Sequence, residues 1–176
     1  MKEKKDLKFP AKGVIVIAAV IRGRIRMWEY LDGKWTGEAA AKMYKGPLLK
    51  AMKKAFPEHA AKKRAFWKVL EANDPTGYKS GLAKEAKAEV RIITNDLPKR
   101  SPDLNVLDYS LWAEINTRMR AQEKMFPKSK KESFDAFKAR LRRTAPGLPE
   151  SVVRKAASDM YKRVRMAVAA GGGHIE

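Results

Sequence analysis

The chain has 176 residues, which is the size of one ordinary domain or of one domain with an appendage. Hydrophobic residues make up 44% of it, enough to form a core, and the lack of cysteine excludes a disulfide scaffold, a thiolate zinc site and a cysteine nucleophile. Lys and Arg outnumber Asp and Glu by 39 to 20, and a compact body with a formal net charge of +19 repels itself unless an anionic partner neutralises it. Nucleic acid is the usual partner of so basic a domain, and it is the partner that we expect.

The first predicted element is a strand. Val14–Ile21 is apolar and mostly β-branched, which is typical of a strand buried on both faces, and its eight residues are too few to span a bilayer, so we expect no membrane partner. Arg22–Arg24 supplies a turn into a second strand that ends at Leu31, which predicts a hairpin. Alternation along the second strand predicts one buried and one exposed face, with Ile25, Met27 and Leu31 on one side and Arg26, Trp28 and Tyr30 on the other.

The middle of the chain alternates helices with strands. Thr36 can cap a helix over residues 37–56, which Gly46-Pro47 should kink or split. Residues 65–72 predict a third strand, and the Asn-Asp-Pro sequence that follows ends it. A short helix over residues 82–90 and a short strand at Ile92-Ile93 complete an α/β order.

The last third of the chain has helical periodicity. An apolar stripe begins this region and predicts a helix, and two further helices follow over residues 130–143 and 150–169. Gly171–Gly173 predicts a flexible tail. The stripe consists of Leu104, Leu107, Leu111, Ile115 and Met119.

One stretch is far more specific than composition. Ser101–Trp112 has the sequence Ser-Pro-Asp-Leu-Asn-Val-Leu-Asp-Tyr-Ser-Leu-Trp. It resembles the signature of the mariner-like family of DNA transposases, in which Ser-Pro-Asp-Leu-Asn precedes the third catalytic carboxylate. The resemblance covers nearly the whole chain, because Leu70–Pro75 is similar to the family's second-aspartate strand, Val14–Leu31 to its hairpin, and Met160–Arg163 with Gly172-Gly173-His174 to its C-terminal end.

The resemblance implies a ribonuclease H-like catalytic domain that cuts and rejoins DNA, with three carboxylates that hold two Mg²⁺ ions. The expected fold is therefore α/β, an incomplete ribonuclease H-like sheet (the hairpin plus two further strands) flanked by helices, with an α-helical C-terminal extension. We divide the chain into a basic N-terminal segment (1–13), a ribonuclease H-like, transposase-derived domain (14–125), a basic helical extension (126–170) and a flexible tail (171–176).

Asp108 occupies the position of the third carboxylate. It shares a predicted helix face with Leu111, Trp112 and Ile115, so we expect it to point toward the sheet. A carboxylate there is costly unless a cation or hydrogen-bond donors satisfy it. The alternative is an ordinary carboxylate at a helix start that accepts bonds from backbone N–H groups.

The other two ligands of the resembled family are missing. Ala72 stands at the position of the second carboxylate, and a methyl group cannot coordinate magnesium. Asp74 lies two residues further on, about 6.6 Å along a strand, whereas catalytic metal ions lie only about 3.5–4 Å apart. Asp6 precedes the hairpin, where the first aspartate would be, but no apolar strand surrounds it. We expect no cofactor in the chain as it stands, and Mg²⁺ only if the site is rebuilt.

A further expectation concerns the sheet. In the resembled family the first aspartate lies on a central strand that precedes the hairpin, and only thirteen residues precede Val14 here. A sheet without that strand has two unpaired edges. Either another polypeptide supplies the strand, or the remaining strands pair with each other, in which case strand 14–21 would bond directly to strand 65–72.

Basic residues dominate the C-terminal half, where acidic residues are scarce. On helices such cations can form ridges that follow a phosphate backbone, although any amphipathic helix also needs a solvated polar face. The candidate nucleic-acid-binding residues are Lys128, Lys130, Lys131, Lys138, Arg140, Arg142, Arg143, Arg154, Lys155, Lys162, Arg163 and Arg165.

Two functions are consistent with these patterns. The first is a transposase-derived protein that has lost catalysis and binds DNA or RNA as a structural part of a nucleoprotein or ribonucleoprotein assembly, with other protein chains as partners. The second is a fragment or an inactivated form of a mariner-like transposase that catalyses Mg²⁺-dependent DNA strand cleavage and transfer. The family implies the nucleus, and a ribonucleoprotein role would also fit a mitochondrion or another organelle.

Overall fold

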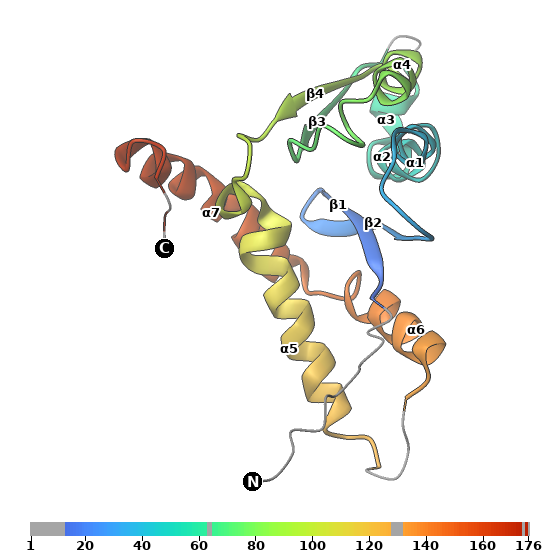
Figure 1. Ribbon diagram of the computed structural model, residues 1–176, viewed down its shortest axis with the longest axis vertical. Helices are drawn as coiled ribbons and strands as arrows, with labels where there is room; N and C mark the ends of the chain where they lie inside the picture. The colour runs from blue at the N-terminus through green and yellow to red at the C-terminus, as the bar shows by residue number, and fades with distance from the viewer. Residues whose placement is uncertain (1–12, 63–64, 128–131, 174, 176) are drawn as a thin grey trace, which may run out of the picture.

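The computed structural model describes residues 13–62, 65–127, 132–173 and 175. The N-terminal hairpin is one of two small sheets, and the second sheet and a set of helices surround it (Figure 1). The overall α/β architecture is the one that the sequence predicts. In the described residues, no helix is both long and apolar enough to cross a membrane. The elements are β1 (Ile15–Ile21), β2 (Arg24–Leu31), α1 (Gly37–Met43), the π turn η1 (Tyr44–Leu48), α2 (Leu49–Ala55), α3 (Pro57–Ala60), β3 (Trp67–Glu71), α4 (Gly81–Glu89), β4 (Ile92–Asp96), the 3₁₀ turn η2 (Pro102–Leu104), the π turn η3 (Leu107–Leu111), α5 (Trp112–Glu123), α6 (Phe134–Thr144) and α7 (Glu150–Ala169).

The hairpin of β1 and β2 forms as predicted, but the prediction that its first strand is buried on both faces is wrong: Ile15 is exposed, residues 16–20 are half-buried and Ile21 is buried. The pairing of the two strands also has one irregularity. Ala19 pairs with Met27 but Val20 pairs with Ile25, so Arg26 is an extra residue in β2, and its side chain donates to the Ile21 carbonyl at 3.1 Å. Such a bulge reverses the alternation of the residues beyond it. The prediction that Ile25 and Met27 share a face is therefore wrong.

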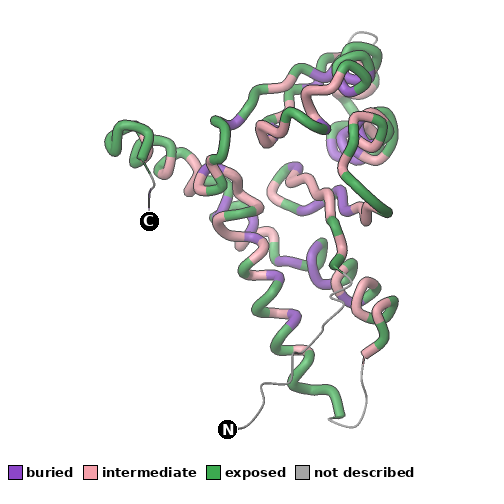
Figure 2. The backbone as a smooth tube through the Cα atoms, in the orientation of Figure 1, coloured by how far each residue is buried: buried purple, intermediate pink, exposed green. Residues whose placement is uncertain are grey.

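Both faces of the hairpin are covered, so the prediction of an exposed face on β2 is also wrong. Met27 packs with α1, α2, α4 and the sheet of β3 and β4. Ile25 and Trp28 pack on the opposite side with residues of α5 and α7. The hairpin thus lies between two hydrophobic cores. Figure 2 shows buried segments, in purple, on either side of it. The C-terminal helices cover the face of β2 that includes Trp28 and Tyr30, which we expected to be exposed to solvent.

The predicted helix over residues 37–56 exists and is interrupted where expected. The Thr36 hydroxyl caps α1 by accepting from the Ala39 amide at 3.3 Å. Pro47 has no amide to donate, and the chain passes it in the π turn η1 before α2 continues to Ala55. Tyr44, at the start of this turn, has no exposed surface.

The strands β3 and β4 form a second, parallel sheet in which Trp67 is opposite Ile92 and Glu71 is opposite Asp96. The helix α4 makes the crossover between them, and Ser80 caps its start, because the Ser80 hydroxyl accepts from the Ala83 amide. Within the described residues β1 pairs only with β2, and β3 pairs only with β4. Direct pairing of the first and third strands, one of the two arrangements considered above, does not occur.

The C-terminal helices form the second core. Most residues of the predicted apolar stripe are buried. Leu111, Ile115 and Met119 pack in one cluster with the hairpin and with residues of α6 and α7. At the end of α7 the chain turns back, because the Gly172 amide donates to the Ala167 carbonyl at 2.8 Å. Ile175 is then buried beside Leu97 and Leu104, so this residue is packed where the glycines predicted a flexible tail.

We predict that the hairpin turn requires glycine. Arg22 and Gly23 both have positive φ, +50° and +69°, which is the requirement of a two-residue type I′ turn. A Cβ at position 23 would also meet the Arg154 side chain at 2.5 Å. Gly23→Ala should lower the free energy of unfolding by about 1 kcal/mol or more, as measured by urea denaturation.

The control for this variant is Gly81→Ala, at the first position of α4, where an added Cβ has no atom within 4 Å. It should raise stability by about 0.5–1 kcal/mol, because alanine loses less backbone entropy than glycine in a helix. Equal effects at the two positions would contradict the turn assignment.

Candidate functional site

The carboxyl ends of β3 and β4 bring polar residues together. Glu71 and Asp96 are the last residues of the two strands and lie opposite each other. Glu71 is buried, with 6% of its surface exposed, on the same face of β3 as Trp67. A buried carboxylate needs charged or donating partners.

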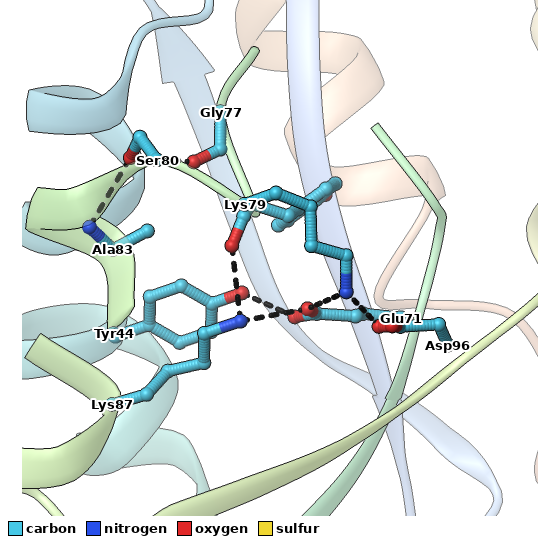
Figure 3. Close-up of polar contacts among 9 residues, drawn as sticks. Tyr44, Glu71, Gly77, Lys79, Ser80, Ala83, Lys87 and Asp96 are labelled. Atoms are coloured by element: carbon cyan, nitrogen blue, oxygen red, sulfur yellow. Dashed lines mark hydrogen bonds and ion pairs between the residues drawn. The ribbon is translucent and has the colours of Figure 1, made fainter. Parts of the chain in front are cut away.

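Three side chains satisfy Glu71, as Figure 3 shows. The Tyr44 hydroxyl donates to one carboxylate oxygen. The Lys87 ammonium lies 2.8 Å and the Lys79 ammonium 3.4 Å from the other oxygen. Lys79 also pairs with Asp96, so the network joins both strand ends to α4. Burial, together with the neighbouring Glu71 carboxylate, raises the pKa of the Tyr44 hydroxyl far above its usual range.

The sequence analysis missed this network. Glu71 alternates with Trp67 and Val69 along β3, and Lys87 follows Ala83 by one helical turn on α4. A carboxylate and an ammonium at core-facing positions of adjacent elements are the signal that could have identified it, since charged residues are rarely buried without a partner. Through these three partners, Glu71 links the end of β3 to Tyr44 of η1 and Lys87 of α4.

Ala72 follows Glu71 directly and is half-buried at the edge of a large cavity. Asp74, two residues later, uses one carboxylate oxygen to accept the Thr76 amide at 2.8 Å, which closes a turn. Tyr78 lies close to these residues: burial first, and then the charges of Glu71, Asp74 and Asp108, raise the pKa of its hydroxyl to about 12. Ala72, at the end of β3, and Asn105–Leu107 of the signature segment line the same cavity.

Asp108 does not point into the sheet. Its side chain is exposed. One carboxylate oxygen accepts a hydrogen bond from the side-chain amide of Asn105 at 2.8 Å, and the other accepts one from the Trp112 indole N–H at 3.1 Å. The expectation of a buried carboxylate is wrong because residues 107–111 form a π turn, which shifts the helical phase that the sequence predicted. The alternative, a carboxylate bonded to backbone N–H groups, does not describe it either, since both donors are side chains.

These residues do not fit a two-metal site. In the part of the chain that the structure describes, no three His, Cys, Asp or Glu side chains are placed to hold a metal ion. Glu71 is committed to Tyr44 and two lysines, and Asp74 to its turn. Asp108 is exposed and already accepts bonds from Asn105 and Trp112, and a methyl group stands at position 72. No catalytic step through magnesium can be derived from this arrangement.

The predicted basic surface is only partly available. Arg140 is buried, with its guanidinium paired to Glu132 at 2.6 Å and Glu123 at 3.0 Å and donating to the Met119 carbonyl at 2.8 Å. Arg140 holds the pKa of the Glu132 carboxyl below its usual range by hydrogen bonding. Its assignment as a nucleic-acid-binding residue is therefore wrong: it fixes α6 to the end of α5.

The remaining candidates differ in exposure. Lys138 and Arg163 are half-buried, and Arg163 donates to the Asp103 carbonyl at 2.6 Å. Arg154 and Lys155 are exposed but pair along α7 with Glu150 and Asp159. Four are exposed with no ion pair among the described residues: Arg142, Arg143, Lys162 and Arg165. Lys128, Lys130 and Lys131 lie outside the described residues, as does Asp6.

These exposed cations do not form one ridge. Arg142 and Arg143 are in the last turn of α6, where the Arg142 guanidinium lies 5.0 Å from the Tyr30 ring centre. Lys162 and Arg165 are in the second half of α7, which extends away from α6 on the other side of α5 (Figure 1). A phosphate backbone would meet two separate basic groups.

No family model matches the sequence, and no curated protein is similar to it at significant level. Solved structures are similar in fold. The catalytic domain of Mos1 mariner transposase superposes with a TM-score of 0.76 at 15% identity, over 93% of this chain and 76% of that chain. The same catalytic domain with Raltegravir and Mg gives a TM-score of 0.75 at 16% identity, over 93% of this chain and 77% of that chain.

A pre-cleavage Mos1 transpososome is also similar, with a TM-score of 0.71 at 17% identity, over 100% of this chain and 52% of that chain. The chain therefore has the fold of a mariner transposase catalytic domain, and the resemblance that the signature segment indicated is confirmed at the level of the fold. An identity of 15–17% establishes the architecture, and it carries no activity by itself.

We predict that the two lysines beside Glu71 differ in importance. Lys87→Met should lower the free energy of unfolding by about 2–3 kcal/mol, because it removes the buried partner of a buried carboxylate. Lys79→Met should cost no more than about 1 kcal/mol, since Lys79 is more exposed and more distant. Urea denaturation at pH 7 measures both, and equal losses would contradict the ranking.

Proposed function

We propose that this chain is a transposase-derived nucleic-acid-binding protein that no longer cuts DNA and serves as a structural component of a nucleoprotein or ribonucleoprotein assembly. The observation that carries the proposal is Ala72. It stands at the end of β3, where the resembled family has a metal ligand, in a chain whose fold matches the mariner catalytic domain over 93% of its length.

The surrounding residues support the loss of cleavage. Two-metal phosphoryl transfer needs several carboxylates around ions about 3.5–4 Å apart. Asp108 is the one carboxylate at a family ligand position in the described residues, and it already accepts bonds from Asn105 and Trp112. Glu71 cannot replace the missing ligand without giving up its lysine partners.

The charge supports retained binding. The formal net charge of the chain is +19. Although Arg140 is buried, other cations on α6 and α7 are exposed. The similar Mos1 chains were determined in a paired-end complex with the left transposon end and in a strand transfer complex. By analogy with these complexes, we assign this chain a nucleic-acid ligand, bound mainly through its phosphates.

The first test is cleavage. With a supercoiled plasmid and Mg²⁺ or Mn²⁺, the chain should leave the DNA intact, and so should Ala72→Asp, because one restored carboxylate beside Asp108 still leaves the ligand set short of one residue. Agarose electrophoresis measures nicking. Nicking by the unmodified chain would refute the proposal. Nicking by Ala72→Asp that disappears on adding Asp108→Asn would instead favour an inactivated transposase.

The second test is binding. If about six phosphates are neutralised, the affinity for a 30-base-pair duplex should fall about 10³-fold between 50 and 200 mM salt. Arg142→Gln with Arg143→Gln should reduce the slope of log affinity against log salt by about two. Fluorescence anisotropy measures this on duplex DNA and on duplex RNA, and the tighter of the two identifies the class of assembly.

The matched control is Lys53→Gln with Lys54→Gln, two exposed cations at the end of α2. It makes the same change in net charge at a different place and should alter the slope by less than half as much. Equal effects of the two double variants would mean that binding follows net charge alone, and salt-insensitive binding would contradict a phosphate-based interface.

A further inference from the structure

The two sheets present their free edges to one cavity. A cavity of about 710 Å³ is lined by five consecutive residues of β1, Ile17–Ile21, and by all of β3 with Ala72. Neighbouring residues of a strand point to opposite faces. A cavity that contacts every residue in succession therefore lies at the edge of both strands, where unpaired backbone groups are found.

The hydrogen bonds of β3 identify which backbone groups face this cavity. The Trp67 amide donates to Arg91 and the Glu71 carbonyl accepts from Leu97, both at 2.9 Å, on the side of β4. In a parallel ladder alternate residues direct their N–H and C=O to the same neighbour. Lys68 and Leu70 consequently direct their backbone groups away from β4, toward β1.

The strands β1 and β3 run in opposite directions across the cavity. The end of β1 is next to the start of β3, because the Arg22 guanidinium donates to the Ala55 carbonyl at 3.0 Å and lies over Phe56, whose ring is 6.4 Å from that of Trp67. An extended segment between them can therefore pair with both strands, parallel to one and antiparallel to the other.

The size of the cavity fits one strand. Five residues span about 17 Å, so a volume of about 710 Å³ gives a mean cross-section of about 40 Å² along them. A strand spacing of about 4.8 Å and a layer thickness of about 10 Å give a single strand roughly 48 Å². The cavity is therefore about as wide as one strand.

The lining sets the chemistry of the occupant. Met43, Leu48 and Met52 cover one side of the cavity, and Leu107 and Met160 cover the other. A strand covered on both faces reads as a continuous apolar run. The chain as a whole carries a formal net charge of +19, which favours an occupant with acidic flanks.

We propose that the cavity between β1 and β3 accepts an extended segment of another polypeptide, with five or six apolar, mostly β-branched residues between acidic flanks, which joins the two small sheets into one. Residues 1–12 do not have this chemistry, since Lys5, Asp6 and Lys8 would be buried and Pro10 lacks an amide. The proposal rests on the strand edges, the size and lining of the cavity and the net charge, and it is independent of nucleic-acid binding.

The probe is a fluorescein-labelled peptide, Glu-Glu-Val-Ile-Thr-Val-Ile-Val-Glu-Glu, added to the full chain. It should bind saturably in anisotropy, and NMR-detected hydrogen exchange of the Lys68 and Leu70 amides should slow at least tenfold. The same peptide N-methylated at alternate residues keeps its side chains but cannot donate to one edge, and should bind at least tenfold more weakly.

Two proline variants locate the site. Lys68→Pro removes an amide at the cavity edge and should weaken peptide binding at least tenfold. Thr94→Pro removes an amide at the far edge of the same sheet, because the alternation in β4 directs Ile93 and Asn95 toward β3, and should change binding less than twofold. Circular dichroism verifies that both variants are folded.

Three outcomes would overturn the proposal. Equal binding of the parent and methylated peptides would mean adhesion through side chains. Equal effects of the two proline variants would place the peptide elsewhere. Slow exchange of the Lys68 and Leu70 amides before any peptide is added would mean that the chain closes this edge with its own residues.

Discussion

The burial of both faces of the β1–β2 hairpin is the constraint on which the rest of the molecule depends. Because β1 is apolar at every position, neither of its faces can be left in water without cost. One face organises α1, α2, α4 and the second sheet, and the other organises α5, α6 and α7. The hairpin therefore lies between the two cores of a transposase-like architecture.

The polar residues follow from that arrangement. The parallel crossover through α4 brings Lys87 to the end of β3, where Glu71 would otherwise be a buried charge without a partner. In the folds it resembles, this end of the sheet belongs to a catalytic domain. Here two lysines and a tyrosine stabilise the carboxylate at the same end of the sheet.

How far the sequence predicts the structure depends on the range of the interaction. Strand 15–21, the Thr36 cap and the interruption at Pro47 follow from local periodicity and backbone chemistry, and all are found. The extra residue at Arg26 and the π turn at 107–111 each shift the phase by one residue, which no periodic pattern reveals, and they misplace Ile25 and Asp108. Arg140 is indistinguishable from a surface cation until Glu123 and Glu132 are brought beside it by the packing of α6 on α5.

The π turn before α5 also separates two evolutionary demands. A helix of uninterrupted 3.6-residue period would couple the direction of Asp108 to that of Leu111 and Ile115, so that any drift in core packing would rotate the carboxylate as well. The wider turn absorbs that rotation within Leu107–Leu111. Core residues downstream and the signature residues upstream can therefore change independently of each other.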